Sequence, residues 1–388
     1  MTTDHGSHGG SGRWLRRVLV AASVAAVGLV AGAGSANAAP VAVACGDVIT
    51  TNVHLRQDLS CAGPGLIIGA SNITVDLDGH TITGTATGNH FGPAGISFTS
   101  AGGSTPSGVT VRRGTIQGFD VGINGSDGSG TSFVRLNLLD NGTGLQYLHS
   151  APAPDSLRSS QISGSTNGIE FDAFNGPQRL AANGNEISGN VVGIASSQVN
   201  GITLSANQIH DNGTGVRLLE SDGWLIDSNK IHDNDVGVVL TEVSGATVSG
   251  NHITDNRVGV QLDIEGTSAN PDQIVDNVFA RNGSAGVLAT AGVGTTPSVI
   301  SGNTFRKNGF APGGTTDAAG QIVDDGLHVS ATTGGSAATI TVADNTAKHN
   351  ADYGIEAPGV TDGGGNQAAG NGNPAQCTGV TCVGAAAP

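Results

Sequence analysis

The sequence predicts an all-β fold, a single-stranded right-handed parallel β-helix, and three observations carry this prediction. A glycine followed by Ile, Val or Leu recurs along the chain, with equal spacing from Gly193 through Gly215 and Gly237 to Gly259. Short apolar alternations accompany each glycine, as in buried strands, and helical spacing is missing. Aromatic residues make up only 3% of the chain, too few for an ordinary packed core of this length. Regular repeats of this kind indicate a solenoid.

The glycine anchors set the number of coils that we expect. The repeat predicts a solenoid of about eleven coils, with one anchor in each, at Gly95, Gly122, Gly144, Gly168, Gly193, Gly215, Gly237, Gly259, Gly286, Gly326 and Gly354. We expect the β-helix to span residues 73–360.

Three apolar columns and two asparagine columns recur in each repeat. The apolar columns, represented in one repeat by Leu204, Ile209 and Val216, predict three strands per coil that fill a narrow core. The asparagines predict ladders, because a stacked amide can both donate to and accept from neighbouring coils. We expect the ladders at Asn185, Asn207, Asn229, Asn251, Asn277, Asn303 and Asn345, and at Asn190, Asn212, Asn234, Asn256, Asn282, Asn308 and Asn350.

The start of the chain has the pattern of an export signal. Arg13, Arg16 and Arg17 precede an apolar run, and small residues end at Ala38, so residues 1–38 are predicted to be a signal peptide. General secretion fits better than the twin-arginine route. The apolar run is short for a membrane span, so we expect a secreted protein with no membrane span.

The four cysteines fall into two local pairs near the ends of the exported part. Four cysteines allow three connectivities, and local pairing, Cys45–Cys61 and Cys377–Cys382, is the simplest. Zinc ligation is the rival interpretation, although no CxxC spacing supports it. We expect residues 39–72 and 361–388 to be end caps that the two disulfides staple.

The charge of the chain limits its partners. Removing three arginines and one aspartate with residues 1–38 changes the net charge from -15 to -17. Phosphate backbones need clustered Lys and Arg, so nucleic acid is not expected as a partner. Acidic sugars would need a bridging cation, and a monomer is expected.

Two stretches carry a resemblance to a known family. CGDVIT…LSCAGPGLIIGASNITVDLDGHTITG, from Cys45, resembles the opening of secreted bacterial right-handed parallel β-helix repeat proteins, and GGGNQAAGNGNPAQCTGVTC, from Gly363, resembles their ending. This superfamily is pectate-lyase-like and includes NosD-type proteins. The resemblance covers nearly the whole exported part. It implies the fold, and it leaves the activity open because the family includes several enzyme classes and members without one.

Two groups of surface residues are candidates for metal or substrate chemistry. His210 and His232 occupy the same position in consecutive repeats, with His252 on the neighbouring outer column, and could hold a transition metal. An acidic group could supply an acid and a base, or bind Ca²⁺; it includes the candidate catalytic pair Glu220 and Glu242 and the candidate ligand-binding pair Asp263 and Glu265. The favoured explanations are that a duplicated repeat carries duplicated surface residues and that an acidic chain has a solvated acidic face.

An insertion between two anchor glycines and a stripe of basic residues are the remaining candidates. The extra residues between Asn308 and Gly326 form an insertion that ends in Asp324 and Asp325, with His328 close behind. We take Asp324 and Asp325 as candidate catalytic residues and His328 as a candidate ligand-binding residue, because long loops on regular solenoids often carry function. The stripe consists of Arg281, Arg306, Lys307, Lys348 and His349.

The known active-site signatures of the family are missing from the sequence. Polygalacturonase, pectate-lyase and alginate-epimerase motifs have no match here. The sequence therefore predicts a non-catalytic extracellular binding or surface module that contacts an extracellular polysaccharide or a cell-surface glycan. The alternatives are a polysaccharide lyase or glycoside hydrolase and a NosD-like accessory protein linked to a metal.

Overall fold

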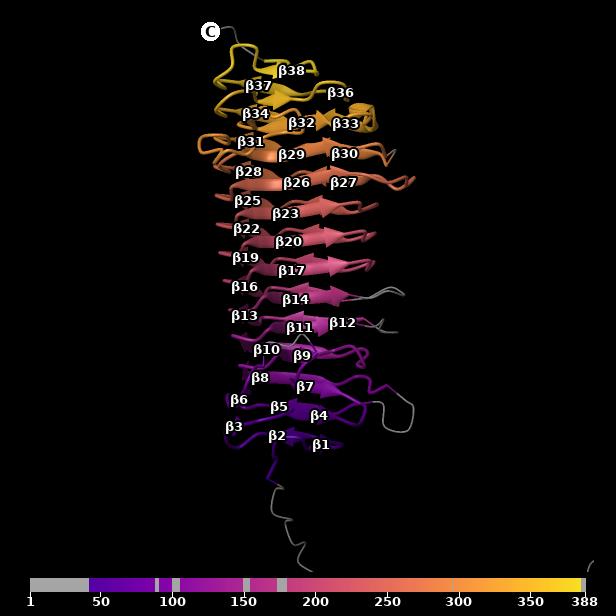
Figure 1. Ribbon diagram of the computed structural model, residues 1–388, viewed down its shortest axis with the longest axis vertical. Coiled ribbons are helices and arrows are strands. Elements are labelled where there is room, and N and C mark those ends of the chain that lie inside the picture. Colours follow the sequence, from indigo (N-terminus) through magenta and orange to yellow (C-terminus); the bar gives the residue numbers. More distant parts are fainter. Residues whose placement is uncertain are drawn as a thin grey trace, which may run out of the picture. The chain divides into compact units, whose positions relative to one another are not determined.

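The computed structural model describes residues 42–87, 91–99, 105–148, 154–172, 180–294 and 296–384. The predicted signal peptide, residues 1–38, lies outside these ranges. Residues 42–388 form one compact unit, and its described part is a solenoid of short parallel strands (Figure 1). The predicted parallel β-helix is confirmed.

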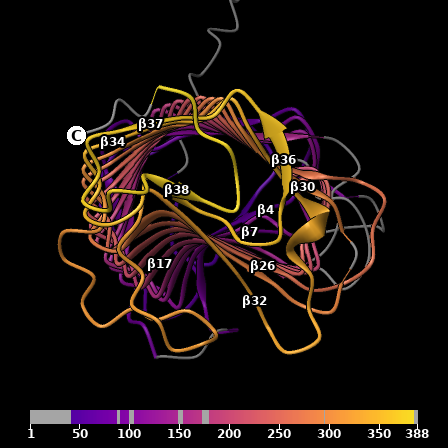
Figure 2. The same cartoon turned by 90° about the horizontal axis from the view of Figure 1, so that it is seen from above.

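Three faces run along the solenoid and enclose its core (Figure 2). Every strand pairs in parallel with the equivalent strand of the next coil. Face A is a fourteen-stranded sheet made of β1 (Val48–Ile49), β4 (Leu66–Ile68), β7 (Ala94–Phe98), β9 (Val121–Asn124), β11 (Thr143–Tyr147), β14 (Asn167–Asp172), β17 (Val192–Ser197), β20 (Thr214–Leu219), β23 (Val236–Thr241), β26 (Val258–Ile264), β29 (Ala285–Ala291), β32 (Leu327–Ala331), β35 (Ile355–Glu356) and β38 (Cys377–Thr378).

Faces B and C follow face A in each coil, and β8 and β10 are long enough to belong to both. Face B contains β2 (Val53–His54), β5 (Thr74–Asp76), β8 (Thr110–Gln117), β10 (Ser132–Leu139), β12 (Asp155–Arg158), β15 (Leu180–Asn183), β18 (Thr203–Ser205), β21 (Leu225–Asp227), β24 (Thr247–Ser249), β27 (Asp272–Val275), β30 (Ser298–Ser301), β33 (Ile340–Ala343) and β36 (Thr361–Gly364). Besides β8 and β10, face C contains β3 (Leu59–Ser60), β6 (Thr81–Thr83), β13 (Gln161–Ser163), β16 (Glu186–Ser188), β19 (Gln208–His210), β22 (Lys230–His232), β25 (His252–Thr254), β28 (Val278–Ala280), β31 (Thr304–Arg306), β34 (Thr346–Lys348) and β37 (Gln367–Ala369).

The solenoid is longer than the eleven predicted coils, because both expected caps supply strands. Strands β1 to β4 lie within residues 39–72, and β36 to β38 within 361–388. The register of β1 with β4 puts Gly46 at the anchor position, but Asp47 follows it instead of an aliphatic residue. The register of β35 with β38 puts Gln376 at the anchor. These end coils therefore lack the repeat pattern.

Two disulfides hold the end coils, as predicted. Cys45 is joined to Cys61 across the first coil, and Cys377 to Cys382 across the last. Both bridges are local, so the zinc alternative for these cysteines is excluded, and free cysteines are absent from the described residues.

The predicted columns stack in the interior. Ile209, Ile231, Ile253, Phe279 and Phe305 are all fully buried and meet in register on face C. Their continuous contact supplies the hydrophobic stabilisation that each short strand could not obtain alone.

Both asparagine ladders form and run further than predicted, to Asn366 and Asn371. In a typical rung, the side-chain Nδ2 of Asn234 donates to Oδ1 of Asn256 at 3.0 Å and to the carbonyl oxygen of Ile209 at 3.1 Å. These bonds satisfy buried corner groups that would otherwise lack partners.

The insertion after Asn308 packs against face A. Val323 is fully buried in a small cluster with Val258, Ala285 and Leu288. Arg257 Nη1 donates to Thr315 Oγ1 at 2.7 Å, and residues 316 and 322 form an antiparallel bridge. The insertion is thus a folded cover held by face A, and it positions the residues at its end.

Candidate functional site

The outer surface of face A carries a column of side chains two residues after each anchor glycine. His328 on β32 and Glu356 on β35 belong to this column and pair directly in register. Leu288 on β29 precedes them. Because neighbouring coils are about 4.8 Å apart, the imidazole and the carboxylate of this pair are within contact distance.

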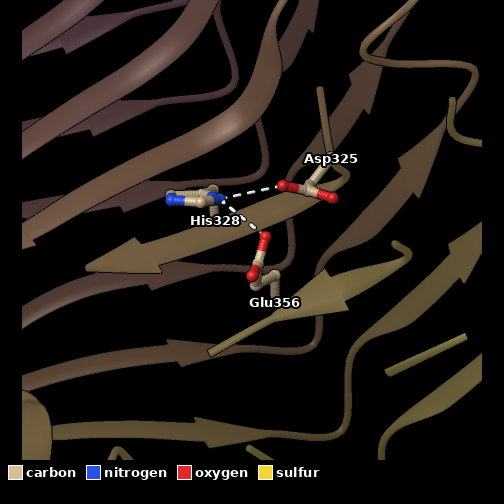
Figure 3. A group of neighbouring side chains, drawn as sticks. All are labelled: Asp325, His328 and Glu356. Atoms are coloured by element: carbon tan, nitrogen blue, oxygen red, sulfur yellow. Dashed lines mark hydrogen bonds and ion pairs between the residues drawn. The ribbon is translucent and has the colours of Figure 1, made fainter. Parts of the chain in front are cut away.

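His328 lies between two carboxylates (Figure 3). Its Nδ1 is 2.8 Å from Oδ2 of Asp325 and 3.2 Å from Oε2 of Glu356. The side chain of Asp325 is 0% exposed and that of His328 is 2% exposed, whereas that of Glu356 is 20% exposed. Glu356 is therefore the member of this acid–histidine cluster (Asp325, His328 and Glu356) that solvent or a substrate can reach.

Backbone contacts fix Asp325. Its Oδ1 accepts from the backbone N–H of Tyr353 at 2.8 Å, which leaves Oδ2 for His328. Asp325 thus links two coils and orients the imidazole. A carboxylate held in this way selects the ring nitrogen that carries a proton.

The insertion supplies a third carboxylate on the other side of the ring. Oδ1 of Asp317 accepts from the backbone N–H groups of Ala319 and Gln321, at 2.9 and 2.8 Å. Its Oδ2 lies 3.5 Å from Nε2 of His328, which is buried and has no hydrogen-bond partner. In Figure 3 this second nitrogen points away from Asp325 and Glu356. Asp317 therefore acts on His328 through its charge.

A second acidic group adjoins the cluster. Asp324, Asp325 and Asp352 each place a carboxylate oxygen within 4.8 Å of the others. The backbone N–H of Asp352 donates to the carbonyl oxygen of Asp324 at 3.1 Å. Of the described Lys and Arg residues, none forms an ion pair with these aspartates, with Asp317 or with Glu356, so His328 is the nearby cation.

Burial and mutual repulsion shift the pKa values of this region. Burial raises the pKa of Asp325, although the hydrogen bond from His328 opposes the shift. Burial, together with the charge of Asp325, raises the pKa of Glu356. Burial lowers the pKa of His328, but Asp325, Glu356 and Asp317 outweigh burial and raise it. Burial also raises the pKa of Asp324, with repulsion from Asp352 and Glu356.

These shifts have a chemical consequence. A carboxylic acid whose pKa moves towards neutrality can hold and release a proton near physiological pH. The pKa of Glu356 is raised by burial and by the charge of Asp325, and its side chain is also accessible. The cluster can therefore transfer a proton to or from a bound molecule, with His328 and Asp325 behind the reacting group.

Two sets of described residues have the donors for a metal ion. Asp325, His328 and Glu356 offer two oxygens and a nitrogen, and Asp324, Asp325 and Asp352 offer three oxygens. The first set suits a transition metal and the second suits Ca²⁺.

The three histidines predicted to bind a metal are not among the described groups of three donor atoms that lie within 4.8 Å of one another. The rings of His210 and His232 are stacked, with centroids 4.9 Å apart and planes 2° from parallel. Each Nδ1 is 2.7 Å from the following aspartate, Asp211 or Asp233. Nε2 of His210 also lies 3.6 Å from Oε1 of Glu186. A metal site at these histidines remains a prediction. His252 pairs in register with Lys230, a cation.

The predicted acidic pair lies at a corner, away from the acid–histidine cluster. Glu220 and Glu242 are exposed and follow face A in consecutive coils, each with a positive φ. Glu220 accepts from Nε2 of Gln198 at 2.8 Å. Asp263 accepts from Nε2 of Gln261 at 2.9 Å, and Glu265 is exposed. Both pairs remain predictions as catalytic or ligand-binding sites.

The structure brings together Asp324, Asp325 and His328 from the predicted set and adds Glu356, Asp317 and Asp352. The sequence does carry a signal for Glu356. His328 follows Gly326 by two residues, and Glu356 follows Gly354 by two, so both belong to one outer column. No sequence period places Asp317, because the insertion lies outside the repeat.

Comparisons with known proteins support the fold. The family model described as "Right handed beta helix region" matches residues 196–371. No curated protein sequence matches the chain. The periplasmic alginate epimerase AlgG is similar in structure at 12% identity, with 87% of this chain and 74% of that chain covered and a TM-score of 0.45.

Two further solved structures are similar in the same way. The DFA-IIIase from Arthrobacter chlorophenolicus A6, in complex with GF2, has 14% identity and a TM-score of 0.44, over 77% of this chain and 85% of that chain. The A-module of the Azotobacter vinelandii mannuronan C-5 epimerase AlgE6 has 14% identity and a TM-score of 0.44, over 86% and 91%. At such identities the likeness concerns the fold alone.

The prediction of a non-catalytic binding module is wrong as the main interpretation. It depended on the absence of linear active-site motifs, but the acid–histidine cluster is assembled from adjacent coils and leaves no linear motif. The similar structures are also named as epimerases and a DFA-IIIase. The alternative, an enzyme that acts on polysaccharides, replaces it as the hypothesis.

Two observations bear on location. No helix in the described ranges is long and apolar enough to cross a membrane. The two disulfides agree with an oxidising compartment outside the cytosol. The parallel coils, together with the family model that matches residues 196–371, show that the chain has the right-handed parallel β-helix fold.

Proposed function

We propose that the chain is a secreted, polysaccharide-active enzyme in which Glu356 transfers a proton and His328 and Asp325 support it. The observation that carries this proposal is the gradient of exposure through the acid–histidine cluster, from 0% at Asp325 and 2% at His328 to 20% at Glu356. An accessible carboxyl group backed by a buried imidazole and a buried carboxylate is an arrangement for acid–base catalysis.

The geometry favours a lyase over a glycoside hydrolase. Hydrolysis uses two carboxyl groups on opposite sides of the glycosidic bond, about 5–5.5 Å apart in retaining and about 6.5–9.5 Å apart in inverting enzymes. Asp325 and Glu356 instead contact the same nitrogen of His328, with their nearest oxygens within 4.8 Å. No sugar fits between them, and Asp325 is closed to solvent.

Elimination needs only one base on one side of the sugar. The base takes the ring proton next to the carboxylate of a uronic acid, and the electron pair of that C–H bond forms the C=C bond as the glycosidic C–O bond breaks. The leaving oxygen keeps the C–O electron pair and takes a proton from water. Glu356 is placed for the first of these transfers. Its raised pKa makes it a stronger base than an ordinary glutamate.

A screen against neutral and acidic polysaccharides, with and without Ca²⁺, tests the proposal. We expect unsaturated products, detected by ultraviolet absorbance, from at least one acidic polymer. The Glu356→Gln variant should lose activity by about 100-fold or more. Asp127→Asn is the control, because it removes one carboxylate charge from an exposed position in a distant coil that carries no candidate site residue.

Three outcomes count against the proposal. Wild-type protein that forms neither unsaturated products nor new reducing ends would overturn it. Full activity of Glu356→Gln would remove Glu356 from the reaction. New reducing ends without unsaturation would replace the lyase with a hydrolase.

A further inference from the structure

A strip of positive charge runs along the corner between faces C and A in the C-terminal coils. Arg306 and Lys348 pair in register on the outer surface of face C. Arg281, Lys307 and His349 each follow a face C strand and have positive φ values of 55–58°. All five side chains are exposed. We call these five residues the basic strip.

Most of the basic strip lacks an acidic partner. Arg281 forms an ion pair with Asp255 at 2.5 Å. Within the described ranges, Arg306, Lys307, Lys348 and His349 have no ion pair. The unneutralised charges of Arg306, Lys307 and Lys348 repel one another, so clustering them costs stability. In a chain whose exported part carries a net charge of -17, this local excess is the reverse of the overall balance.

Two surface hollows open along the basic strip, and Arg281 lines both. One is lined by Arg281, Lys307, His349 and Phe310 with neighbouring backbone and small side chains. The other is lined by Arg281, Arg306, Lys230, His232, His252 and Thr254. Neither hollow has an acidic residue among its lining residues. Each can therefore receive an anionic group.

Phe310 gives the first hollow an apolar wall. Phe310 is 68% exposed, whereas Phe279 and Phe305 in the core are fully buried. An exposed ring beside cations suits a ligand that has both an apolar ring face and a negative charge. Sugars with acidic groups have both.

The basic strip and the acid–histidine cluster belong to the same coils. The insertion begins directly after Lys307 and Asn308, includes Phe310 and ends at Asp325. In the next coil, Lys348 and His349 precede Glu356 by a single corner. A chain molecule held by the strip would thus lie next to the proton-transferring carboxylate.

We propose that the basic strip and Phe310 bind an acidic polysaccharide, with the cations paired to its anionic groups and Phe310 stacked on a sugar ring. This inference rests on the proposed function for the identity of the ligand as a glycan. A bridging cation is then not needed to bind the acidic polymer, because the basic strip is itself positively charged although the chain as a whole is negatively charged. Coils about 4.8 Å apart present successive charges to a polymer that runs along the solenoid.

The test measures binding in the Glu356→Gln variant, so that turnover does not interfere. Polygalacturonate is the acidic probe and pullulan the neutral one. Removing both lysines by Lys307→Ala and Lys348→Ala should weaken polygalacturonate binding at least tenfold and flatten its salt dependence by about 0.7–0.9 per charge removed. Arg56→Ala with Arg158→Ala is the matched control, because both side chains are exposed away from the strip and cause the same loss of charge.

Phe310→Ala separates stacking from charge. It should weaken polygalacturonate binding without changing the salt dependence of that binding. The binding of acetate, a small anion that has no ring to stack, should not change. In an otherwise wild-type chain, the two lysine changes should raise KM and leave kcat unchanged, because they remove uniform binding.

Each contrary result has a distinct meaning. No polygalacturonate binding at low salt, or an equal loss in the lysine and arginine variants, would overturn the inference. Equal capture by pullulan or by single-stranded DNA would also overturn it, since the site would then not select an acidic glycan. Binding that depends on the strip, in a wild-type protein without turnover, would refute the proposed activity alone.

Discussion

Asp272 begins β27 and is 2% exposed, beneath the corner between faces A and B. Its Oδ1 accepts from the backbone N–H of Ala246 at 3.0 Å. Burial raises the pKa of Asp272 from 3.8 to about 7, and the charge of Asp222 adds to the shift. The folded protein therefore holds a proton here that the unfolded chain releases in mild acid.

The sign of the pH effect follows from this difference. Because the folded-state pKa is raised, the contribution of Asp272 is fully present below pH 3.8 and is lost as the pH rises through about 7. Linkage between these two values gives a loss of about 3 kcal/mol in the free energy of unfolding from pH 5 to pH 8. The Asp272→Asn variant keeps an oxygen for Ala246 but cannot ionise, so it should lack this loss.

Urea unfolding followed by circular dichroism at pH 5 and pH 8 measures the effect. The fall in stability from pH 5 to pH 8 should be smaller in Asp272→Asn than in wild type by about 3 kcal/mol. Glu265→Gln, which removes an exposed carboxylate, should behave as wild type. Equal falls in wild type and Asp272→Asn would refute the reasoning, because Asp272 would then be ionised in the folded protein without cost.

Three further predictions concern the scaffold, and each is checked by equilibrium unfolding. Ile231→Ala removes a fully buried side chain from the face C column and should cost about 2–5 kcal/mol, against a cost near zero for exposed Leu225→Ala. Asn229→Ala should cost about 2–4 kcal/mol, because it leaves the buried amide of Asn207 without its acceptor at 3.0 Å; a cost below about 0.5 kcal/mol would mean that water replaces the ladder. Replacing Cys45 and Cys61 by Ser opens a link over 16 residues and should cost about 3 kcal/mol, with faster hydrogen exchange confined to the first coils; unchanged exchange there would contradict it.

The repeat made most of the scaffold predictable. Ile209 and Ile231 occupy the same place in sequences of equal length, so their stacking follows from the period alone. The asparagine ladders follow for the same reason. The end coils could not be predicted in this way, because Asp47 and Gln376 stand where the repeat has an aliphatic residue and a glycine.

The candidate site was only partly predictable. Asp325 and His328 are close in sequence, and their register with Glu356 could have been obtained from the anchor glycines. The position of Asp317 depends on how the insertion packs through Val323, which has no periodic signal.

For the histidine pair, the position in the coil could be predicted from the sequence but the orientation of the rings could not. Register correctly placed His210 above His232, but their ring orientation depends on which nearby carboxylate captures each nitrogen.

The second asparagine ladder ends at Gln376. In the amide–amide bonds of this ladder, each Nδ2 donates to the asparagine of the next coil towards the C-terminus, so the last asparagine, Asn371, requires an acceptor beyond it. Oε1 of Gln376 accepts from both the backbone N–H and Nδ2 of Asn371 at 3.0 Å, while its own Nε2 donates back to the carbonyl oxygens of Asn371 and Asn373. The amide–amide hydrogen bonds of this ladder thus all run in one direction, and Gln376 ends the series. Duplication of an internal coil could lengthen the rod without leaving an amide unpaired, but a coil appended after Gln376 could not continue the array. Within the part of the chain that the structure describes, this closure gives the last amides of the second ladder, those of Asn371 and Gln376, hydrogen-bond partners inside the molecule.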